Sequence, residues 1–288
     1  MVEYYSLSNG KIELTVMNLG ATITSIKYCG REQLLRYETP EEYIKGTDYI
    51  GATVGRYGNR IKNSSFNLEG TAYTLAPNEG KNQLHGGPNA FSSREWAVNA
   101  NRSRIRMSIE SPAGDNGFPG NLRMTVTFTV TNHSVHIYFE GRSDAVTVFA
   151  PTVHPYFIAN NATIQINADS HLEVDSELIP TGKILPCEGD FDYHEDRPVG
   201  SRALDDCFIL RDEYACPFER TGTTMEMWTD FPAIQVYTGE YLNPPLSPCS
   251  GIAIEPEFYP DSPNHPEFPS TVLKPGEIFG KYVEYKFF

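Results

Sequence analysis

The chain has 288 residues, enough for one large β domain or two ordinary domains, and its formal net charge is −14. A surface of that sign repels nucleic acid and anionic membranes, so we expect neither as a partner. The 23 glycines, 21 prolines, 17 tyrosines and 16 phenylalanines favour a turn-rich fold built from strands.

The termini and cysteines bear on the cellular compartment. The five cysteines have no metal-binding spacing and are too few for a disulfide scaffold, so we interpret them as reduced thiols. The N-terminus lacks a basic segment followed by an apolar core, and no apolar run approaches the ~20 residues of a membrane helix. We expect a soluble cytoplasmic protein, either a monomer or a homodimer.

Period-two alternation of apolar and polar residues recurs along the chain and predicts half-buried strands. The clearest runs cover residues 12–16, 105–109, 122–130, 135–139 and 283–287. Glu69-Gly70 predicts a tight hairpin within residues 66–75, and Thr131-Asn132-His133 predicts a second one within residues 122–139.

Helical signals are few. Residues 39–44 begin with a Thr N-cap, a proline at N1 and two acids, which predicts a short helix, whereas residues 204–209 fit strand or turn. No linker or internal repeat divides the chain. We therefore predict an all-β fold, one large antiparallel β-sandwich domain over residues 1–288, with two smaller β domains as the alternative.

The strongest chemical signal is the run Gly251-Ile-Ala-Ile-Glu255-Pro-Glu257. Residues i and i+2 of a strand share a face, so Glu255 and Glu257 are expected to point the same way. A carboxylate at the end of a buried strand is costly unless it is paired, solvated or used in chemistry. The alternative, a salt-bridged acid at a strand end, stays open on these residues alone.

Three further segments carry residues suited to binding. Gly55-Arg-Tyr-Gly-Asn-Arg60 combines glycines with two arginines and an asparagine, and Leu84-His-Gly-Gly87 places a histidine on a glycine loop. Val153-His-Pro-Tyr-Phe157 puts His154 and Tyr156 on one face, and its proline requires an edge or strand-end position. Each is weak alone, because exposed arginines and structural histidines are common.

Together, and in this order, these segments resemble the aldose 1-epimerase (galactose mutarotase) family. Further similar segments are Leu204-Asp-Asp-Cys-Phe208, Gln235-Val-Tyr-Thr-Gly239 and the run from Pro260 to Pro269. The resemblance covers essentially the whole chain and implies a large antiparallel β-sandwich. It also implies interconversion of the α and β anomers of a free hexose by ring opening and reclosure.

The resemblance implies a role for each matching residue. Glu255 corresponds to the general base and His154 to the general acid, a couple that needs neither metal nor cofactor. His85 corresponds to a second histidine near the reacting end of the sugar. The remaining substrate-binding positions are Asn59, Arg60, Tyr156, Asp205 and Gln235.

The chain departs from the family pattern at two places that matter. Val153, Pro155 and Ile158 surround His154 where the family often has Asn-His-Ser-Tyr-Phe-Asn, and Asn132-His133-Ser134 lies at the wrong place in the chain to replace it. Glu257 stands where the family commonly carries Gln. If Glu257 faces the pocket, its charge raises the pKa of Glu255 and makes it a stronger base.

Two other functions stay open from the sequence. A hexose 6-phosphate mutarotase needs a cationic subsite, for which Arg56, Arg60 and Arg94 are available. A catalytically inert sugar-binding protein needs hydroxyl contacts but no acid–base couple. We interpret the acidic residues 190–196 as a solvated loop, His133, His136, His171 and His265 as surface or structural residues, and Trp96 and Trp228 as core residues.

Overall fold

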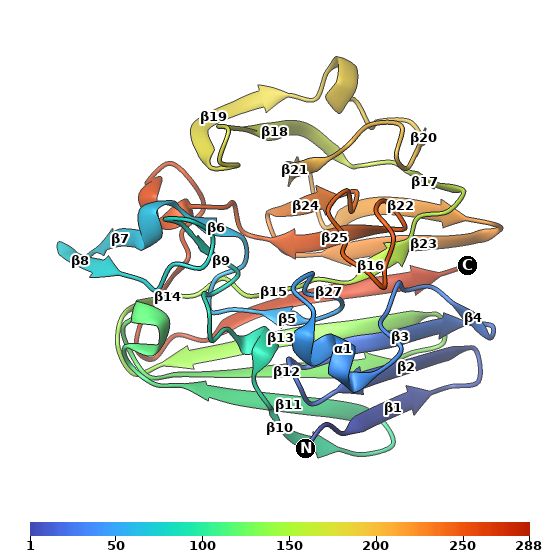
Figure 1. Cartoon of the computed structure of the whole chain (residues 1–288), viewed down its shortest axis with the longest axis horizontal. Coiled ribbons are helices and arrows are strands. Elements are labelled where there is room, and N and C mark those ends of the chain that lie inside the picture. Colours follow the sequence, from blue (N-terminus) through green and yellow to red (C-terminus); the bar gives the residue numbers. More distant parts are fainter.

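The computed structural model describes all 288 residues, which form three large antiparallel sheets and four small two-stranded ones (Figure 1). The nine-stranded sheet runs β10 (Ala97–Ala100), β11 (Arg104–Ser111), β12 (Leu122–Val130), β13 (Ser134–Ser143), β27 (Phe279–Phe287), β23 (Thr223–Thr229), β22 (Tyr214–Arg220), β17 (Ala162–Ile164) and β20 (Arg197–Pro198). The six-stranded sheet runs β16 (Tyr156–Ile158), β25 (Gly251–Glu257), β24 (Ala233–Tyr237), β21 (Asp205–Leu210), β18 (Ala168–Val174) and β19 (Pro180–Pro186). The four-stranded sheet is β1 (Tyr4–Ser8), β2 (Ile12–Met17), β3 (Thr22–Tyr28) and β4 (Arg31–Glu32).

The small sheets and helices connect these layers. The pairs are β5 (Thr53–Val54) with β15 (Thr152–Val153), β6 (Arg60–Ile61) with β9 (Gln83–Leu84), β7 (Ser65–Leu68) with β8 (Thr71–Thr74), and β14 (Thr147–Val148) with β26 (Val272–Leu273). The α-helix is α1 (Pro40–Lys45), and 3-10 turns span Lys62–Ser64, Phe91–Ser93, Asp115–Gly117, Gly189–Phe191 and Ser262–Asn264. No helix is long and apolar enough to cross a membrane.

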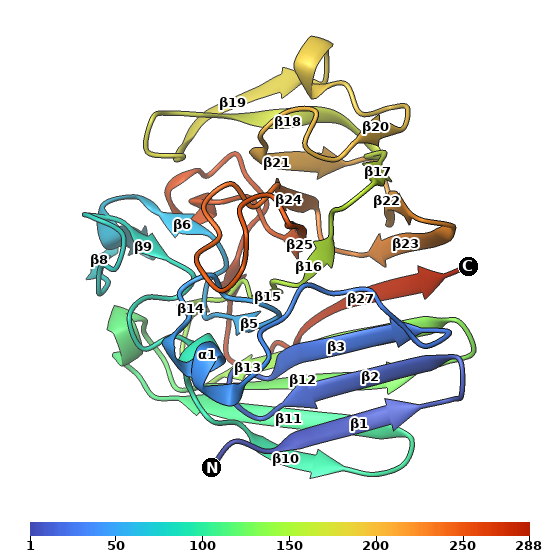
Figure 2. The ribbon, with the colours of Figure 1, turned by 45° about the vertical axis from the view of Figure 1, so that its right-hand side comes forward.

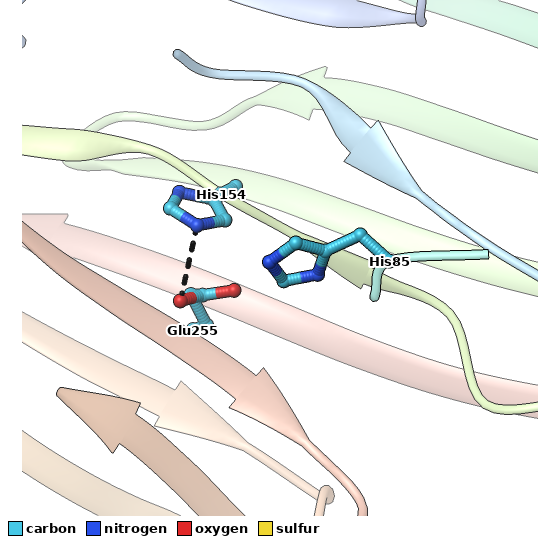
Figure 3. A group of neighbouring side chains, drawn as sticks. All are labelled: His85, His154 and Glu255. Atoms are coloured by element: carbon cyan, nitrogen blue, oxygen red, sulfur yellow. Dashed lines mark ion pairs between the residues drawn. The ribbon is translucent and has the colours of Figure 1, made fainter. Parts of the chain in front are cut away.

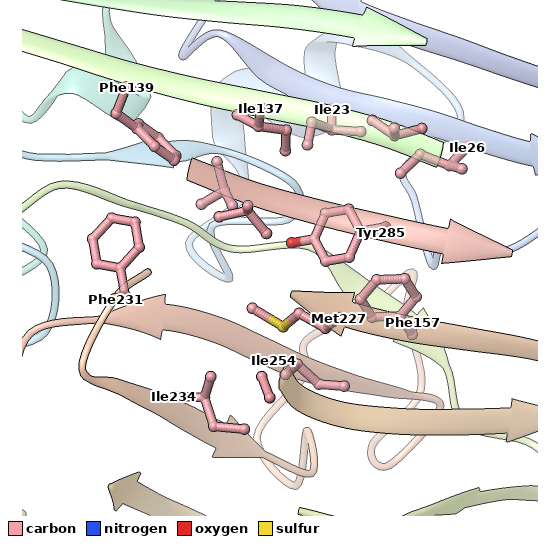
Figure 4. Packing of buried hydrophobic residues seen from close by; sticks show 14 of the residues in the cluster. Ile23, Ile26, Ile137, Phe139, Phe157, Met227, Phe231, Ile234, Ile254 and Tyr285 are labelled. Carbon is pink, nitrogen blue, oxygen red and sulfur yellow. The ribbon is translucent and has the colours of Figure 1, made fainter. Parts of the chain in front are cut away.

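The layers form the predicted all-β sandwich. Figure 2 shows β1–β3 lying over β10–β13, while β27 continues the same sheet toward β23 and β22. One continuous hydrophobic core joins the three sheets. In Figure 4, Tyr285 of β27 lies between Ile23 and Ile137 on one side and Met227 and Ile254 on the other. Because this shared core includes strands from both ends of the chain, it supports the proposal of one domain over residues 1–288.

The elements expected from local sequence are confirmed. Both predicted hairpins form, β7–β8 and β12–β13, and the alternating runs near residues 12, 105 and 283 are β2, β11 and β27. Helix α1 begins after Thr39, whose backbone N–H donates to the Glu42 carboxylate at 2.8 Å, as in a capping box. The ambiguous residues 204–209 are mostly strand, since β21 begins at Asp205.

The two tryptophans differ in their environment. Trp96 is buried as predicted, and its indole N–H donates to the Phe91 carbonyl at 3.0 Å. The core prediction for Trp228 is wrong, because β23 alternates and turns Met225 and Met227 inward and Trp228 outward. The Lys286 ammonium lies 4.4 Å from the centre of the Trp228 ring, on the outer face.

The six-stranded sheet has one apolar and one polar face, and the polar face positions the site. Ile252 and Ile254 of β25 enter the core, whereas Glu255 and Glu257 point to the opposite face. Glu255 pairs in register with Gln235 of β24, which pairs with Cys207 of β21. Side chains in register across antiparallel strands share a face, so these three stand in one row.

Candidate active site

A pocket of about 430 Å³ opens over the polar face of the six-stranded sheet, next to the loops around residues 47–60 and 84–85. It is lined by Thr47, Asp48, Tyr49, Asn59, Arg60, Glu79, Leu84, His85, His154, Tyr156, Leu178, Asp205, Gln235, Tyr237, Tyr241, Asn243 and Glu255. Every site residue predicted from the sequence is in this set. The structure therefore brings together side chains from segments almost 200 positions apart in the chain.

Glu255 and His154 form a close pair in the wall of the pocket. His154 lies between β15 and β16, and its Nε2 is 3.3 Å from Glu255 Oε1 (Figure 3). Both side chains are almost fully buried, and β16 is the edge strand of its sheet, as Pro155 required. Glu255 Oε2 and His154 Nδ1 are fully buried and have no hydrogen-bond partner in the protein.

Burial shifts both groups of the pair toward their neutral forms. It lowers the pKa of His154 to about 4. It raises the pKa of Glu255 well above its usual value, and the nearby carboxylates of Glu257 and Asp205 raise it further. With a pKa of about 4 the imidazole is uncharged near neutral pH, so the contact drawn in Figure 3 is not between two charges in the free protein, and the raised pKa of Glu255 favours retention of a proton on its carboxyl group.

His85 is fixed as a hydrogen-bond donor. Its Nδ1 accepts from the Asn59 backbone N–H at 3.1 Å, and its own backbone N–H donates to the Asn59 carbonyl at 3.1 Å. Burial, and then the charges of His154 and Arg60, hold its pKa well below the usual value, so the ring is neutral. A neutral ring that accepts at Nδ1 carries its proton on Nε2, which leaves a donor free for a ligand.

The loop that carries His85 depends on a glycine. Gly86 has a φ of +88°, and a Cβ there would lie 2.0 Å from the Gly55 carbonyl oxygen. The two binding loops thus touch through backbone atoms, which only glycine permits. Tyr49 packs against the same histidine, with ring centres 4.6 Å apart.

Asp205 and Gln235 form a ready-made acceptor site for hydroxyls. Gln235 Nε2 donates to Asp205 Oδ1 at 2.6 Å, which orients both groups and leaves Gln235 Oε1 buried without a partner. Burial raises the pKa of Asp205, and the charge of Arg60 and the Gln235 hydrogen bond oppose that rise. Adjacent amide and carboxylate oxygens can accept from two hydroxyls of one ligand.

The three arginines considered for a phosphate have different surroundings. Arg60 lines the pocket, but its guanidinium is bound through two nitrogens to Glu79, at 2.8 and 2.9 Å. Arg56 is buried outside the pocket and donates to backbone carbonyls, and Arg94 binds Asp115 at 2.6 Å. The prediction that all three are available to a ligand is wrong, because two of them hold the protein together.

Glu257 shares a strand face with Glu255, as predicted, but lies below the pocket and is not paired with an arginine. Its Oε1 accepts from Asn59 Nδ2 at 3.2 Å, and the Cys207 thiol also donates to it. Its other oxygen has no partner, and the side chain is buried. Asn59 therefore faces the pocket with one amide proton already used.

Several lining residues were missed from the sequence. Asp48 accepts from Asn243 Nδ2 at 2.8 Å and from the Tyr37 hydroxyl at 2.8 Å, which ties two loops together beside the pocket. Tyr241 is 83% exposed at the same pocket. Tyr237 follows Gln235 by two positions, and strand alternation predicts that it shares the face. The loop residues carry no comparable signal.

One group of side chains has the composition of a metal site. One donor atom from each of His85, His154 and Glu255 lies within 4.8 Å of the others. The same groups suit acid–base chemistry without a metal, so we assign none there, and its absence stays a prediction. The acidic residues 190–196 do not gather into such a group.

The chain was also compared with known proteins. The sequence profile described as aldose 1-epimerase matches residues 3–286. Aldose 1-epimerase of Escherichia coli K12 is 33% identical, with 97% of this chain and 93% of that protein covered, and human galactose mutarotase is 30% identical, with 99% and 94% covered. Among solved structures, an aldose epimerase homologue from C. elegans has a TM-score of 0.95 at 27% identity, covering 100% of this chain and 99% of that one. The chain belongs to the aldose 1-epimerase family.

Proposed function

We propose that this protein is an isomerase that interconverts the α and β anomers of free hexoses of the glucose and galactose type. One observation supports this most strongly: a buried carboxyl–imidazole pair, Glu255 and His154, lies in the same pocket as Asp205 and Gln235. Relatives named aldose 1-epimerase and galactose mutarotase support the same reaction. Proton transfers alone complete it, so the proposal includes no cofactor.

The reaction needs one base and one acid. Ring opening removes the proton from the C1 hydroxyl and protonates the ring oxygen. Rotation about C1–C2 then exposes the other face of the aldehyde, and the two proton transfers reverse on closure. A pair that shares a single proton satisfies both halves, because each group acts once as acid and once as base.

Glu255 is the proposed base and His154 the proposed acid for ring opening. Their separation of 3.3 Å allows the proton held by Glu255 to pass to His154, which gives a carboxylate beside an imidazolium. That form has the base and the acid required. Both side chains are buried, so a polar ligand beside them would stabilise the charges that the transfer creates.

The remaining residues are proposed to hold the sugar. His85 Nε2–H is suited to donate to the oxygen at C1 as it gains negative charge. Asp205 and Gln235 accept from ring hydroxyls, while Asn59, Arg60 and Tyr156 complete the wall. These roles follow from the place of each side chain in the pocket lining and from the matching positions of the family.

The pocket does not favour a phosphorylated sugar. Arg60 is the only arginine or lysine in its lining, and it is already bound to Glu79. Asp48 and Asp205 add further carboxyl groups to the wall. A phosphate dianion would enter against these charges, so free hexoses are the proposed substrates.

Polarimetry of freshly dissolved sugars tests the proposal. The protein should accelerate the mutarotation of α-glucose and α-galactose well beyond the spontaneous rate, and it should act at least tenfold less efficiently on glucose 6-phosphate. Glu255→Gln should lower kcat by about 10² to 10⁴, the usual contribution of one general base, while sugar binding measured by calorimetry persists.

Glu13→Gln is the matched control, since it makes the same chemical change on an exposed carboxylate of β2. It should leave the rate unchanged. A wild-type protein that binds hexoses without accelerating mutarotation would instead be a sugar-binding protein. Equal rates for wild type and Glu255→Gln would refute the assignment of the base.

A further inference from the structure

Glu257 is a buried acid that the proposed mechanism does not use. It lies on β25 two positions beyond Glu255, on the same face, with its side chain opposite Ala233 of β24 and next to the apolar cluster that contains Tyr259 and Phe268. A carboxyl group in such surroundings is costly, and the simplest solution would be an uncharged side chain. We therefore ask whether the negative charge of Glu257 affects the neighbouring acid–base pair.

The contacts of Glu257 favour its ionised form over that of Glu255. Asn59 Nδ2 and the Cys207 thiol both donate to the Glu257 carboxylate, whereas no backbone or amide group donates to Glu255. Two buried carboxylates on one strand face cannot easily ionise together. Burial raises the pKa of Glu257 well above its usual value, as it does for Glu255, but these donors oppose the rise at Glu257. Of the two carboxyl groups, Glu257 is therefore the one that ionises first.

Five charged or titratable side chains surround Glu257. They are Glu255 on its own strand, Asp205 and Cys207 on β21, and Tyr57 and Arg60 on the loop before β6. Arg60 is the only cation among them, and Glu79 neutralises it through two hydrogen bonds. Arg60 acts to lower the pKa of both glutamates, so it does not cancel the effect of one carboxylate on the other.

We propose that Glu257 is a positioning residue that ionises before Glu255, with its negative charge stabilised by Asn59 and Cys207, and that this charge makes the Glu255–His154 pair more basic. This inference rests on the proposed function of that pair. The negative charge of Glu257 favours protonation of both Glu255 and His154. It therefore favours the state in which the pair holds one proton, which is the state proposed to catalyse ring opening. A more basic Glu255 also removes the C1 proton more readily once it has passed its own proton to His154.

The size of the effect follows from strand geometry. Residues two apart on a strand are separated by about 7 Å. At the effective dielectric constant of about 20 that describes buried sites, a unit charge at that distance shifts a pKa by between about one and two units. Removal of the charge should move both the acid and the alkaline limb of the activity profile to lower pH.

Glu257→Gln tests this, since the amide keeps the volume and can still accept from Asn59. The log of kcat/KM for galactose should be measured against pH in wild type and variant. We expect both limbs to move toward acid by between about one and two pH units, with a several-fold loss of kcat on the plateau and little change in KM. Cys207→Ala, which removes one donor, should shift the limbs in the same direction by less.

Two results would overturn the inference. If the pH profile of Glu257→Gln has its acid and alkaline limbs at the wild-type pH values, Glu257 is protonated in the wild type and acts as an uncharged side chain, as Gln does in the family. A uniform loss of activity and of melting temperature without a shift would show a purely structural role. If wild type lacked mutarotase activity, the shift would still be measurable as the titration of the Glu255 carboxyl by ¹³C NMR, so failure of the proposed function is distinguishable.

Discussion

Arg56 is expected to stabilise the fold and to play no direct part in ligand binding. The residue is only 2% exposed. Nε donates to Ser111 Oγ at 2.8 Å, Nη1 to the Pro119 carbonyl at 2.7 Å, and Nη2 to the carbonyls of Ser111, Pro112 and Gly120 at 2.6 to 2.9 Å. Burial lowers the pKa of Arg56 to about 10, so it is still charged at neutral pH.

The substitution Arg56→Lys keeps the positive charge and removes the planar set of guanidinium N–H donors. One ammonium group cannot reach carbonyls on several sides, so about two of these hydrogen bonds are lost. Each bond to a charged group is worth about 1.5 to 3 kcal/mol, which predicts a loss of roughly 3 to 6 kcal/mol in the free energy of unfolding. For a chain of this size the melting temperature should fall by roughly 5 to 10 °C.

Urea unfolding followed by the fluorescence of the buried Trp96 measures this loss. Arg142→Lys is the control, because Arg142 is exposed on β13 and pairs only with Glu140; it should change stability by less than about 0.5 kcal/mol. Below its melting temperature, Arg56→Lys should keep the wild-type preference for glucose over glucose 6-phosphate. Unchanged stability together with a selective loss of activity on the phosphorylated sugar would refute this reasoning.

Two further predictions concern the pocket. Asp205→Asn should lower kcat/KM by about 10- to 100-fold, chiefly through KM, because hydrogen bonds to a charged acceptor contribute roughly 1.5 to 3 kcal/mol. Progress curves over a range of galactose concentrations measure both constants, and a change confined to kcat would contradict the prediction. In the folded protein the pKa of His154 is about 4, so His154 stays neutral between pH 7 and pH 5. In the unfolded chain the same residue takes up a proton over this range, so its contribution makes the free energy of unfolding fall as the pH falls. The effect is worth about 2 kcal/mol, and His154→Gln should lose that much less stability between the two pH values in urea titrations; equal losses in both proteins would contradict it.

Strand periodicity was sufficient to predict much of the fold and part of the site. Alternation along β25 placed Glu255 and Glu257 on one face, opposite the apolar residues that enter the core, whereas Gln235 was predicted from the family resemblance. It could not supply the register, which sets Glu255 beside Gln235 and Cys207. Register depends on contacts between segments distant in sequence, and a single sequence does not display them.

The residues that sequence reasoning misjudged are those whose environment is set entirely by tertiary structure. Arg56 and Arg60 stand four positions apart in one motif, yet one is enclosed by carbonyls and the other lines the pocket. Asp48 and Tyr49 lie in a loop without periodicity, so no local pattern marks them as pocket residues. Trp228 was misplaced because large aromatic residues are usually buried, whereas its position on β23 faces outward.

The burial that stabilises this fold also prepares the acid–base pair. Water around Glu255 and His154 would leave the carboxyl ionised and the imidazole mostly neutral at pH 7, with no proton to share. Exclusion of water raises the pKa of Glu255 and lowers that of His154, so burial favours a proton on the carboxyl group over one on the imidazole. The other face of this sheet packs against the core. A carboxyl group on the polar face of the same strand is therefore held away from water by the strand that carries it. The position of Glu255, one residue beyond the buried Ile254, therefore supplies both the location of the proposed base and the burial that raises its pKa.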